Sequence, residues 1–203
     1  MTTFKPFVAL LALLCAVHLP SAMAAKSLVV EVFAHDELAD ISNESLEKDY
    51  FSHWIKEMRE ISAHPIEVVF RRGIAGVTDI DYRNKPPQQT LETFGENASQ
   101  HAKTDGKLIL ITKDIFDSNT AGLASVYYGS GTYAMASMSA YGNAAHELGH
   151  LLSAVHEDSE VKFNGWACET YMQPGRNQLL SNCYRYSDAN RQRIAQNLQR
   201  TLE

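Results

Sequence analysis

Three histidines and a glutamate lie close together in the segment "HELGHLLSAVHE" (residues 146–157). On an α-helix, residues four positions apart share a face, so His146 and His150 can offer imidazole nitrogens to one metal ion. Glu147 follows the first histidine and points partly toward the same side without being needed as a ligand. Zinc-dependent hydrolysis requires such a set, with neutral nitrogens that hold the ion and a carboxylate that accepts a proton from the activated water. The spacing therefore predicts two metal ligands and a general base on one helix.

A third ligand is needed, because a catalytic zinc ion usually has three protein ligands and one open position. His156 lies six residues after His150, too far along a continuous helix to reach the same ion. It can complete the triad if the helix ends near Leu152 or Ser153 and the chain turns back, which predicts a sharp turn at about Ser153. Glu169 is an alternative third ligand, but "ACETYMQPG" around it has no helical pattern. We expect His156 to be the third ligand; ordinary exposed helix residues are the alternative interpretation of the whole segment.

The segment "HELGHLLSAVH" resembles the zinc motif of the metzincin metalloproteases, His-Glu-x-x-His-x-x-Gly-x-x-His, which is accompanied by a downstream methionine turn. The matching methionine is Met172, which follows His156 by 16 residues in "CETYMQPG". Within the metzincins the chain is most similar to the adamalysin or reprolysin branch, through "YMQP" (171–174) and "LSNC" (180–183). The resemblance implies that Met172 forms a hydrophobic floor beneath the metal. It also implies the roles of the motif residues, with Zn²⁺ bound by His146, His150 and His156 and with Glu147 as general base.

Two positions depart from the family pattern. Ser153 stands where the zinc motif has a glycine, and a non-glycine residue in a left-handed turn costs on the order of 1 kcal/mol. Cys168 lies four residues before Met172, where the branch usually has a cysteine two residues before the methionine. The first departure affects whether the turn brings His156 to the metal ion. The second affects the assignment to the adamalysin or reprolysin branch.

The segment "GLASVYY" (122–128) is similar to the family's edge strand, which lies antiparallel to bound peptide. The resemblance implies that a polypeptide substrate pairs with this strand backbone to backbone. The residues expected to take part are Ala124, Ser125, Val126 and Tyr127.

These features predict a secreted zinc-dependent endopeptidase, which hydrolyses peptide bonds by a metal-activated water with Glu147 as general base. The rival hypothesis is a catalytically silent protein on a metzincin scaffold, which holds zinc and recognises a peptide or a partner. Glu147 favours the enzyme, because metal ligation alone does not need it. The sequence leaves open an inhibitor protein as a second partner.

The elements that position these residues alternate between strands and helices. Short runs rich in Val and Ile predict strands, and apolar residues at helical spacing predict the helices between them. Three strands are expected, at 26–34, 64–72 and 107–115, with helices at 42–62 and 90–101. One or two short strands about a glycine turn (122–139) precede the zinc helix, and an irregular C-terminal part ends in a helix from Ser187 or Asp188. We expect an α/β (α+β) metzincin-like fold, with a twisted mixed sheet of about five strands and an antiparallel edge strand.

The first 24 residues differ from the rest of the chain. Lys5, the apolar run "FVALLALLCAV", Pro20 and the small residues "SAMAA" have the layout of a secretory signal peptide cleaved after Ala24. The apolar run is shorter than the roughly 20 residues of a spanning helix, so no membrane span is expected. Residues 25–203 then form a single catalytic domain, secreted or periplasmic, of ordinary globular composition with 45% hydrophobic and 21% charged residues in the whole chain.

The charge and the cysteine content of the chain indicate which partners and which cellular compartment to expect. Residues 1–24 hold Lys5 and no acidic residue, so their removal changes the formal charge from -6 to -7. No basic patch remains for nucleic acid. Cys168 and Cys183 remain after Cys15 is removed, and in an oxidising compartment they are expected to form a disulfide. It would stabilise the fold by roughly 3 kcal/mol. Metal ligation by these cysteines is the alternative, but neither has a CxxC or CxxH context.

Overall fold

The computed structural model describes residues 25–163, 165–177 and 179–202. The expected signal peptide, residues 1–24, lies outside the described residues. In chain order the elements are β1 (Leu28–Ala34), α1 (Asn43–Leu46), α2 (Ser52–Ile61), β2 (Ile66–Arg71), α3 (Pro87–His101), β3 (Lys107–Thr112), β4 (Gly122–Tyr127), β5 (Ser130–Ser137), α4 (Asn143–Leu151), β6 (Val161–Phe163), β7 (Ala167–Glu169), β8 (Ser181–Asn182) and α5 (Asp188–Leu202). Between α1 and α2 lies a π-helical turn, Glu47–Phe51, so the helix expected over 42–62 consists of three segments.

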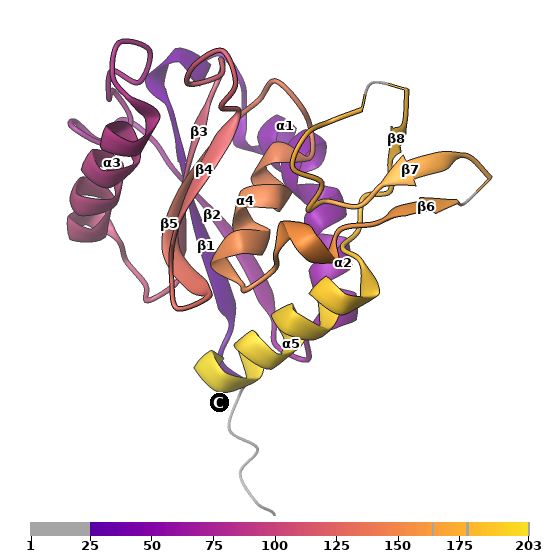
Figure 1. The fold of residues 1–203 in the computed structure, drawn as a ribbon. Coiled ribbons are helices and arrows are strands. Elements are labelled where there is room, and N and C mark those ends of the chain that lie inside the picture. Colours follow the sequence, from indigo (N-terminus) through magenta and orange to yellow (C-terminus); the bar gives the residue numbers. More distant parts are fainter. Residues whose placement is uncertain (1–24, 164, 178, 203) are drawn as a thin grey trace, which may run out of the picture.

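A mixed sheet of five strands forms the centre of the molecule, in the order β2-β1-β3-β5-β4 (Figure 1). Strands β2, β1, β3 and β5 are parallel, and the outermost strand β4 runs antiparallel to β5. Strands β2 and β3 lie on opposite sides of β1. Right-handed crossovers therefore require α2 and α3 to cover opposite faces of the sheet. The predicted fold class, with its antiparallel edge strand, is confirmed.

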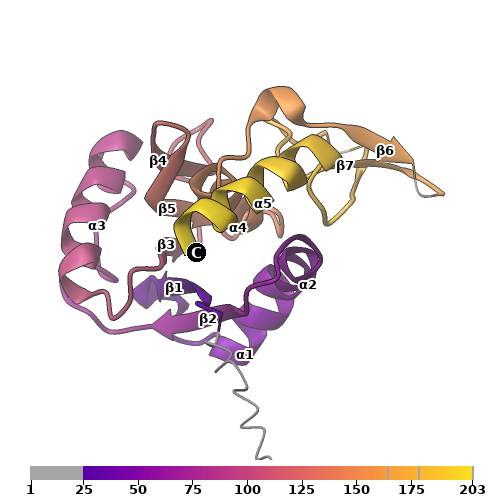
Figure 2. The same ribbon diagram turned by 90° about the horizontal axis from the view of Figure 1, so that it is seen from below.

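The sheet is buried on both faces. Val30 and Val32 of β1 belong to a core with residues of α2, α4 and α5, whereas the neighbouring Phe33 belongs to a second core with residues of α3. Seen from below, α3 lies on one side of the sheet and α2, α4 and α5 lie on the other (Figure 2). Parallel strands covered on both faces are apolar at successive positions, which explains "LVV" and "LILI" in β1 and β3.

The C-terminal part, expected to be irregular, contains a second sheet of three short strands in the order β6-β7-β8. The predicted disulfide is present: Cys168 in β7 is bonded to Cys183, which follows β8, with Cα atoms 5.0 Å apart. This bond fixes a segment that has little secondary structure of its own. None of the helices in the described part of the chain is both long and apolar enough to span a bilayer.

Candidate metal centre and cleft

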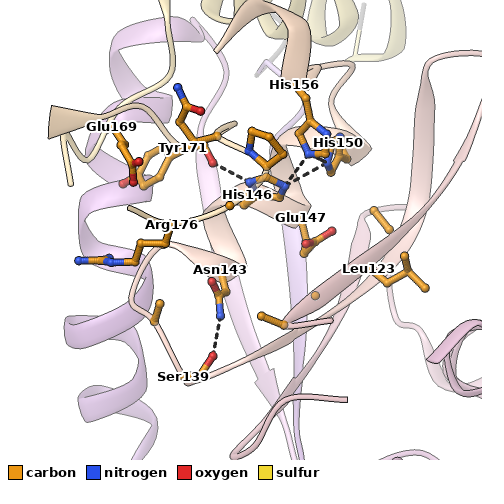
Figure 3. Close-up of a pocket in the computed structure, with 18 of the residues that line it drawn as sticks. Leu123, Ser139, Asn143, His146, Glu147, His150, His156, Glu169, Tyr171 and Arg176 are labelled. Atoms are coloured by element: carbon orange, nitrogen blue, oxygen red, sulfur yellow. Dashed lines mark hydrogen bonds between the residues drawn. The ribbon is translucent and has the colours of Figure 1, made fainter. Parts of the chain in front are cut away.

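Three imidazoles converge where α4 ends and the following segment turns back (Figure 3). The Nε2 atom of His150 lies 3.2 Å from that of His146 and 3.1 Å from that of His156, and the third distance is 3.0 Å. A tetrahedral zinc ion with Zn–N distances of 2.0–2.1 Å holds its nitrogens about 3.3 Å apart. Among the described residues, this is the one group of His, Cys, Asp or Glu side chains close enough to share an ion. The structure thus brings together the three predicted ligands, and the donor set fits zinc.

Hydrogen bonds to the backbone determine the tautomer of two of these imidazoles. The Nδ1–H of His146 donates to the carbonyl of Tyr171 at 2.7 Å, and the Nδ1–H of His150 donates to the carbonyl of Ala154 at 3.2 Å. In a neutral imidazole this leaves a lone pair on Nε2. The two Nε2 atoms therefore face each other as acceptors, an arrangement that a cation between them would satisfy.

Burial favours the neutral form of His146 and His150. It lowers the pKa of His146 to about 3, with the neighbouring His150 adding to the effect. The pKa of His150 is also lowered, first by burial and then by His156. Neutral imidazoles are the form that binds a metal ion, so burial prepares His146 and His150 for ligation.

The turn that brings His156 back is made at Ser153, as the sequence predicted. Helix α4 ends at Leu151, and Ser153 has a left-handed backbone with φ of 76°. Its hydroxyl oxygen accepts a hydrogen bond of 2.9 Å from the side-chain amide of Asn197 in α5. A serine therefore makes this left-handed turn with support from another helix.

A second asparagine of α5 holds the residue before His156. The side chain of Asn190 accepts from the backbone N–H of Val155 at 2.8 Å and donates to the carbonyl of Val155 at 3.0 Å. Asn190 is fully buried, so these bonds are shielded from water. Helix α5 thus fixes both the turn at Ser153 and the backbone just before His156.

The carboxyl group of Glu147 lies between the triad and β4 (Figure 3). It is buried, and burial raises its pKa to about 8. A cation nearby would favour the carboxylate. The first residue of β4 is Gly122, and a Cβ atom there would lie 2.3 Å from Oε1 of Glu147. Only glycine leaves room for the carboxyl group in this position.

The triad opens into a cleft with a volume of about 640 Å³. One wall comes from β4, and the other comes from the segment after β7. The lining includes Gly122, Leu123, Ala124, Val126, Glu169, Thr170, Tyr171, Gln173, Pro174, Gly175 and Arg176. Glu169, the alternative third ligand, lies in this wall and accepts a hydrogen bond from the backbone N–H of Asn177. It stands apart from the three histidines (Figure 3).

Two buried residues support α4 on the side away from the cleft. A Cβ atom on Gly149 would lie 2.6 Å from the sulfur of Met172 and 2.8 Å from the ring of Tyr186, so both pack directly on the helix beside His150. The hydroxyl of Tyr186 donates to the carbonyl of Ala145 at 2.6 Å. Met172 is fully buried, with its sulfur packed against α4 beside His150.

Sequence reasoning missed several residues that shape the site. The carbonyls of Tyr171 and Ala154 bind the ligand imidazoles, but backbone groups leave no signal in side-chain identity. Asn190 and Tyr186 lie 34 and 30 residues after His156, with no spacing that relates them to it. A buried asparagine inside an amphipathic helix is the one sign that could have drawn attention to α5.

No family model matches this chain, and no curated protein matches it in sequence. Among solved structures, it is similar to metalloproteinase-II from Bacteroides fragilis, with a TM-score of 0.66 and 16% identity over 89% of this chain and 55% of the other. A chain in the structure of a chaperone–substrate complex has a TM-score of 0.56 and 10% identity, over 87% of this chain and 34% of the other. The chain thus spans about half the length of the metalloproteinase it matches. At these identities the likeness establishes a shared fold.

Proposed function

We propose that the protein is a secreted zinc-dependent endopeptidase of the metzincin type, most similar to the adamalysin or reprolysin branch. Residues 25–203 would be its catalytic domain, exported by the signal peptide 1–24. The observation that carries the proposal is the convergence of three imidazole Nε2 atoms beside a buried carboxyl group in an open cleft. The fold shared with a metalloproteinase supports it, as does the disulfide, which is typical of exported proteins.

His146, His150 and His156 would hold the zinc ion. When bound, zinc would supply Lewis acidity toward a water molecule and a peptide carbonyl oxygen. Glu147 would accept the proton of that water on its carboxylate and pass it to the nitrogen of the departing amine. Because the Glu147 carboxyl group is buried beside the triad, bulk water would be kept away from it during this proton transfer.

The polypeptide substrate would lie along the free edge of β4. This strand is the outermost of its sheet, so one row of its backbone groups has no partner strand in the part of the chain that the structure describes. Residues 122–124 and Val126 border the cleft at this edge, and an extended peptide could pair with β4 as an added strand. The opposite wall, residues 169–176, would then face the substrate side chains.

The test compares zinc-loaded wild type with Glu147→Gln on a broad peptide library, with and without a chelator. We expect wild type to cleave, the chelator to abolish cleavage, and Glu147→Gln to bind zinc while losing about 10² to 10⁴-fold in kcat. Zinc content measured on both proteins separates loss of the base from loss of the metal. Equal cleavage by the two proteins would overturn the assignment of the base, and zinc binding without any cleavage by wild type would favour the silent binding protein.

A further inference from the structure

The tip of the β4–β5 hairpin carries two tyrosines that the fold leaves in water. Tyr127 is 75% exposed and Tyr128 is 93% exposed. Their rings contact each other edge to face, with centroids 4.3 Å apart. Large apolar side chains exposed next to each other are a common mark of an interaction surface.

The turn itself does not explain an aromatic residue at this position. Tyr128 and Gly129 both have positive φ, 50° and 82°, which is the two-residue hairpin turn that favours Asn-Gly. A bulky residue in the left-handed region costs on the order of 1 kcal/mol. Because the ring of Tyr128 is almost fully exposed, burial offsets little of this cost.

The tyrosine pair continues the wall of the cleft. Val126 lines the cleft and is 45% exposed, and Tyr127 follows it directly in β4. The other end of the same strand, Gly122, contacts the carboxyl group of Glu147. A strand advances about 3.3 Å per residue, so Tyr127 lies at most about 17 Å along β4 from Gly122, the residue beside Glu147. The register of β4 against β5 shifts between Ala124 and Val126, which shortens this path. A peptide paired with this edge reaches the tyrosines after about five residues.

We propose that Tyr127 and Tyr128 form a distal substrate subsite, which selects extended polypeptides with an apolar or aromatic side chain about five residues from the cleaved bond. This inference rests on the proposed function and adds a substrate class to it. Two exposed tyrosine rings offer apolar area and ring edges that an aliphatic or aromatic side chain can cover. A substrate that ends before this point loses the contact.

The variant Tyr128→Asn provides the cleanest test, because asparagine tolerates the left-handed conformation and keeps the turn. It is compared with Tyr127→Thr/Tyr128→Asn, in which threonine maintains strand propensity. Phe163→Thr is the matched control, since Phe163 is 79% exposed on β6, away from the hairpin. Thermal unfolding of each variant verifies that the fold is kept, and we expect Tyr128→Asn to be at least as stable as wild type.

The measurement compares kcat/KM for two peptides. The long peptide has Leu or Phe five residues from the cleaved bond on each side, and the short peptide ends three residues from the cleaved bond on each side. The readout is the kcat/KM of the long peptide divided by that of the short one. We expect the ratio to fall about tenfold in the tyrosine variants and to stay unchanged in Phe163→Thr. The same ratio in all proteins would overturn the subsite while leaving the endopeptidase intact. If wild type cleaves neither peptide, the proposed function fails. In that case, binding of the long peptide is measured to zinc-loaded Glu147→Gln with and without the tyrosine substitutions. The subsite is supported if the substitutions weaken binding about tenfold, and it is overturned if binding is unchanged.

Discussion

At the scale of single residues, the site depends on how closely β4 approaches the carboxyl group of Glu147. The contact at Gly122 leaves no room for a Cβ atom. The position of the proposed base is therefore set by a residue that carries no functional group. A small change at Gly122 should act on proton transfer and leave the metal ligands in place.

We predict that Gly122→Ala displaces the Glu147 carboxyl group and lowers kcat by about 10² to 10⁴-fold, because that range is typical for loss of a positioned acid or base. Zinc content should stay at the wild-type level. The measurements are peptide cleavage and zinc stoichiometry on the same preparation. Gly175→Ala is the matched control, since Gly175 also borders the cleft but a Cβ atom there meets nothing within 4 Å. Full activity in Gly122→Ala would contradict the proposed role of this contact.

At the scale of elements, helix α5 holds the loop that carries His156, the third ligand that we propose. Asn190 bonds both backbone groups of Val155, and Asn197 bonds the hydroxyl of Ser153. Two asparagines on one face of α5 thus support the turn between α4 and His156. We call Asn190 and Asn197, with these hydrogen bonds, the clamp. Substitutions in the clamp should weaken metal binding although they change none of the three histidines.

We predict that Asn190→Ala weakens zinc binding by about 10 to 100-fold, the range seen when groups that orient ligands are removed. The free energy of unfolding should fall by about 1–3 kcal/mol for each buried backbone group left without a partner. Competition with a chromogenic chelator measures the zinc affinity, and denaturant unfolding measures the stability.

Two further variants sharpen this prediction. Asn190→Asp keeps the acceptor for the N–H of Val155 and removes the donor to its carbonyl, so its zinc affinity should lie between wild type and Asn190→Ala. Gln192→Ala, on the exposed side of α5, is the control and should behave as wild type. Wild-type zinc affinity in Asn190→Ala would show that the loop holds His156 without the clamp.

At the scale of the whole molecule, the disulfide joins two segments that few other interactions order. Strands β6, β7 and β8 contain only two or three residues each, and the adjoining segment after β7 forms one wall of the cleft. A covalent link between Cys168 and Cys183 therefore restricts a part of the chain that a large core does not hold.

We predict that the double variant Cys168→Ala/Cys183→Ala loses about 3 kcal/mol of stability, the chain-entropy value for a loop of this length. For a domain of this size the midpoint of thermal unfolding should fall by about 6 to 12 °C. Calorimetry of the variant is compared with calorimetry of reduced wild type, which should give the same shift. An unchanged midpoint in both would mean that other contacts order this region.

The sequence by itself determined the elements and the chemistry that depend on local spacing. Alternating apolar runs predicted the strands and the helices of the α/β fold, because periodicity reflects which faces are buried. The four-residue separation of His146 and His150 predicted two imidazoles on one helical face, and the structure places them together. The turn at Ser153 followed from a length argument, since His156 can approach the others only if the helix stops before it.

Only the tertiary structure decided how these parts are held in place. The carbonyl of Tyr171 that orients His146, the clamp of Asn190 and the contact of Gly122 with Glu147 each join residues at least 25 positions apart. Such pairs depend on how the sheet and the helices pack, which local spacing does not encode. The backbone carbonyls also leave no trace in residue identity, and a glycine required for space looks like any other glycine. The sequence could therefore predict the ligands and the base that we propose, whereas the groups that fix their positions became visible only in the folded chain.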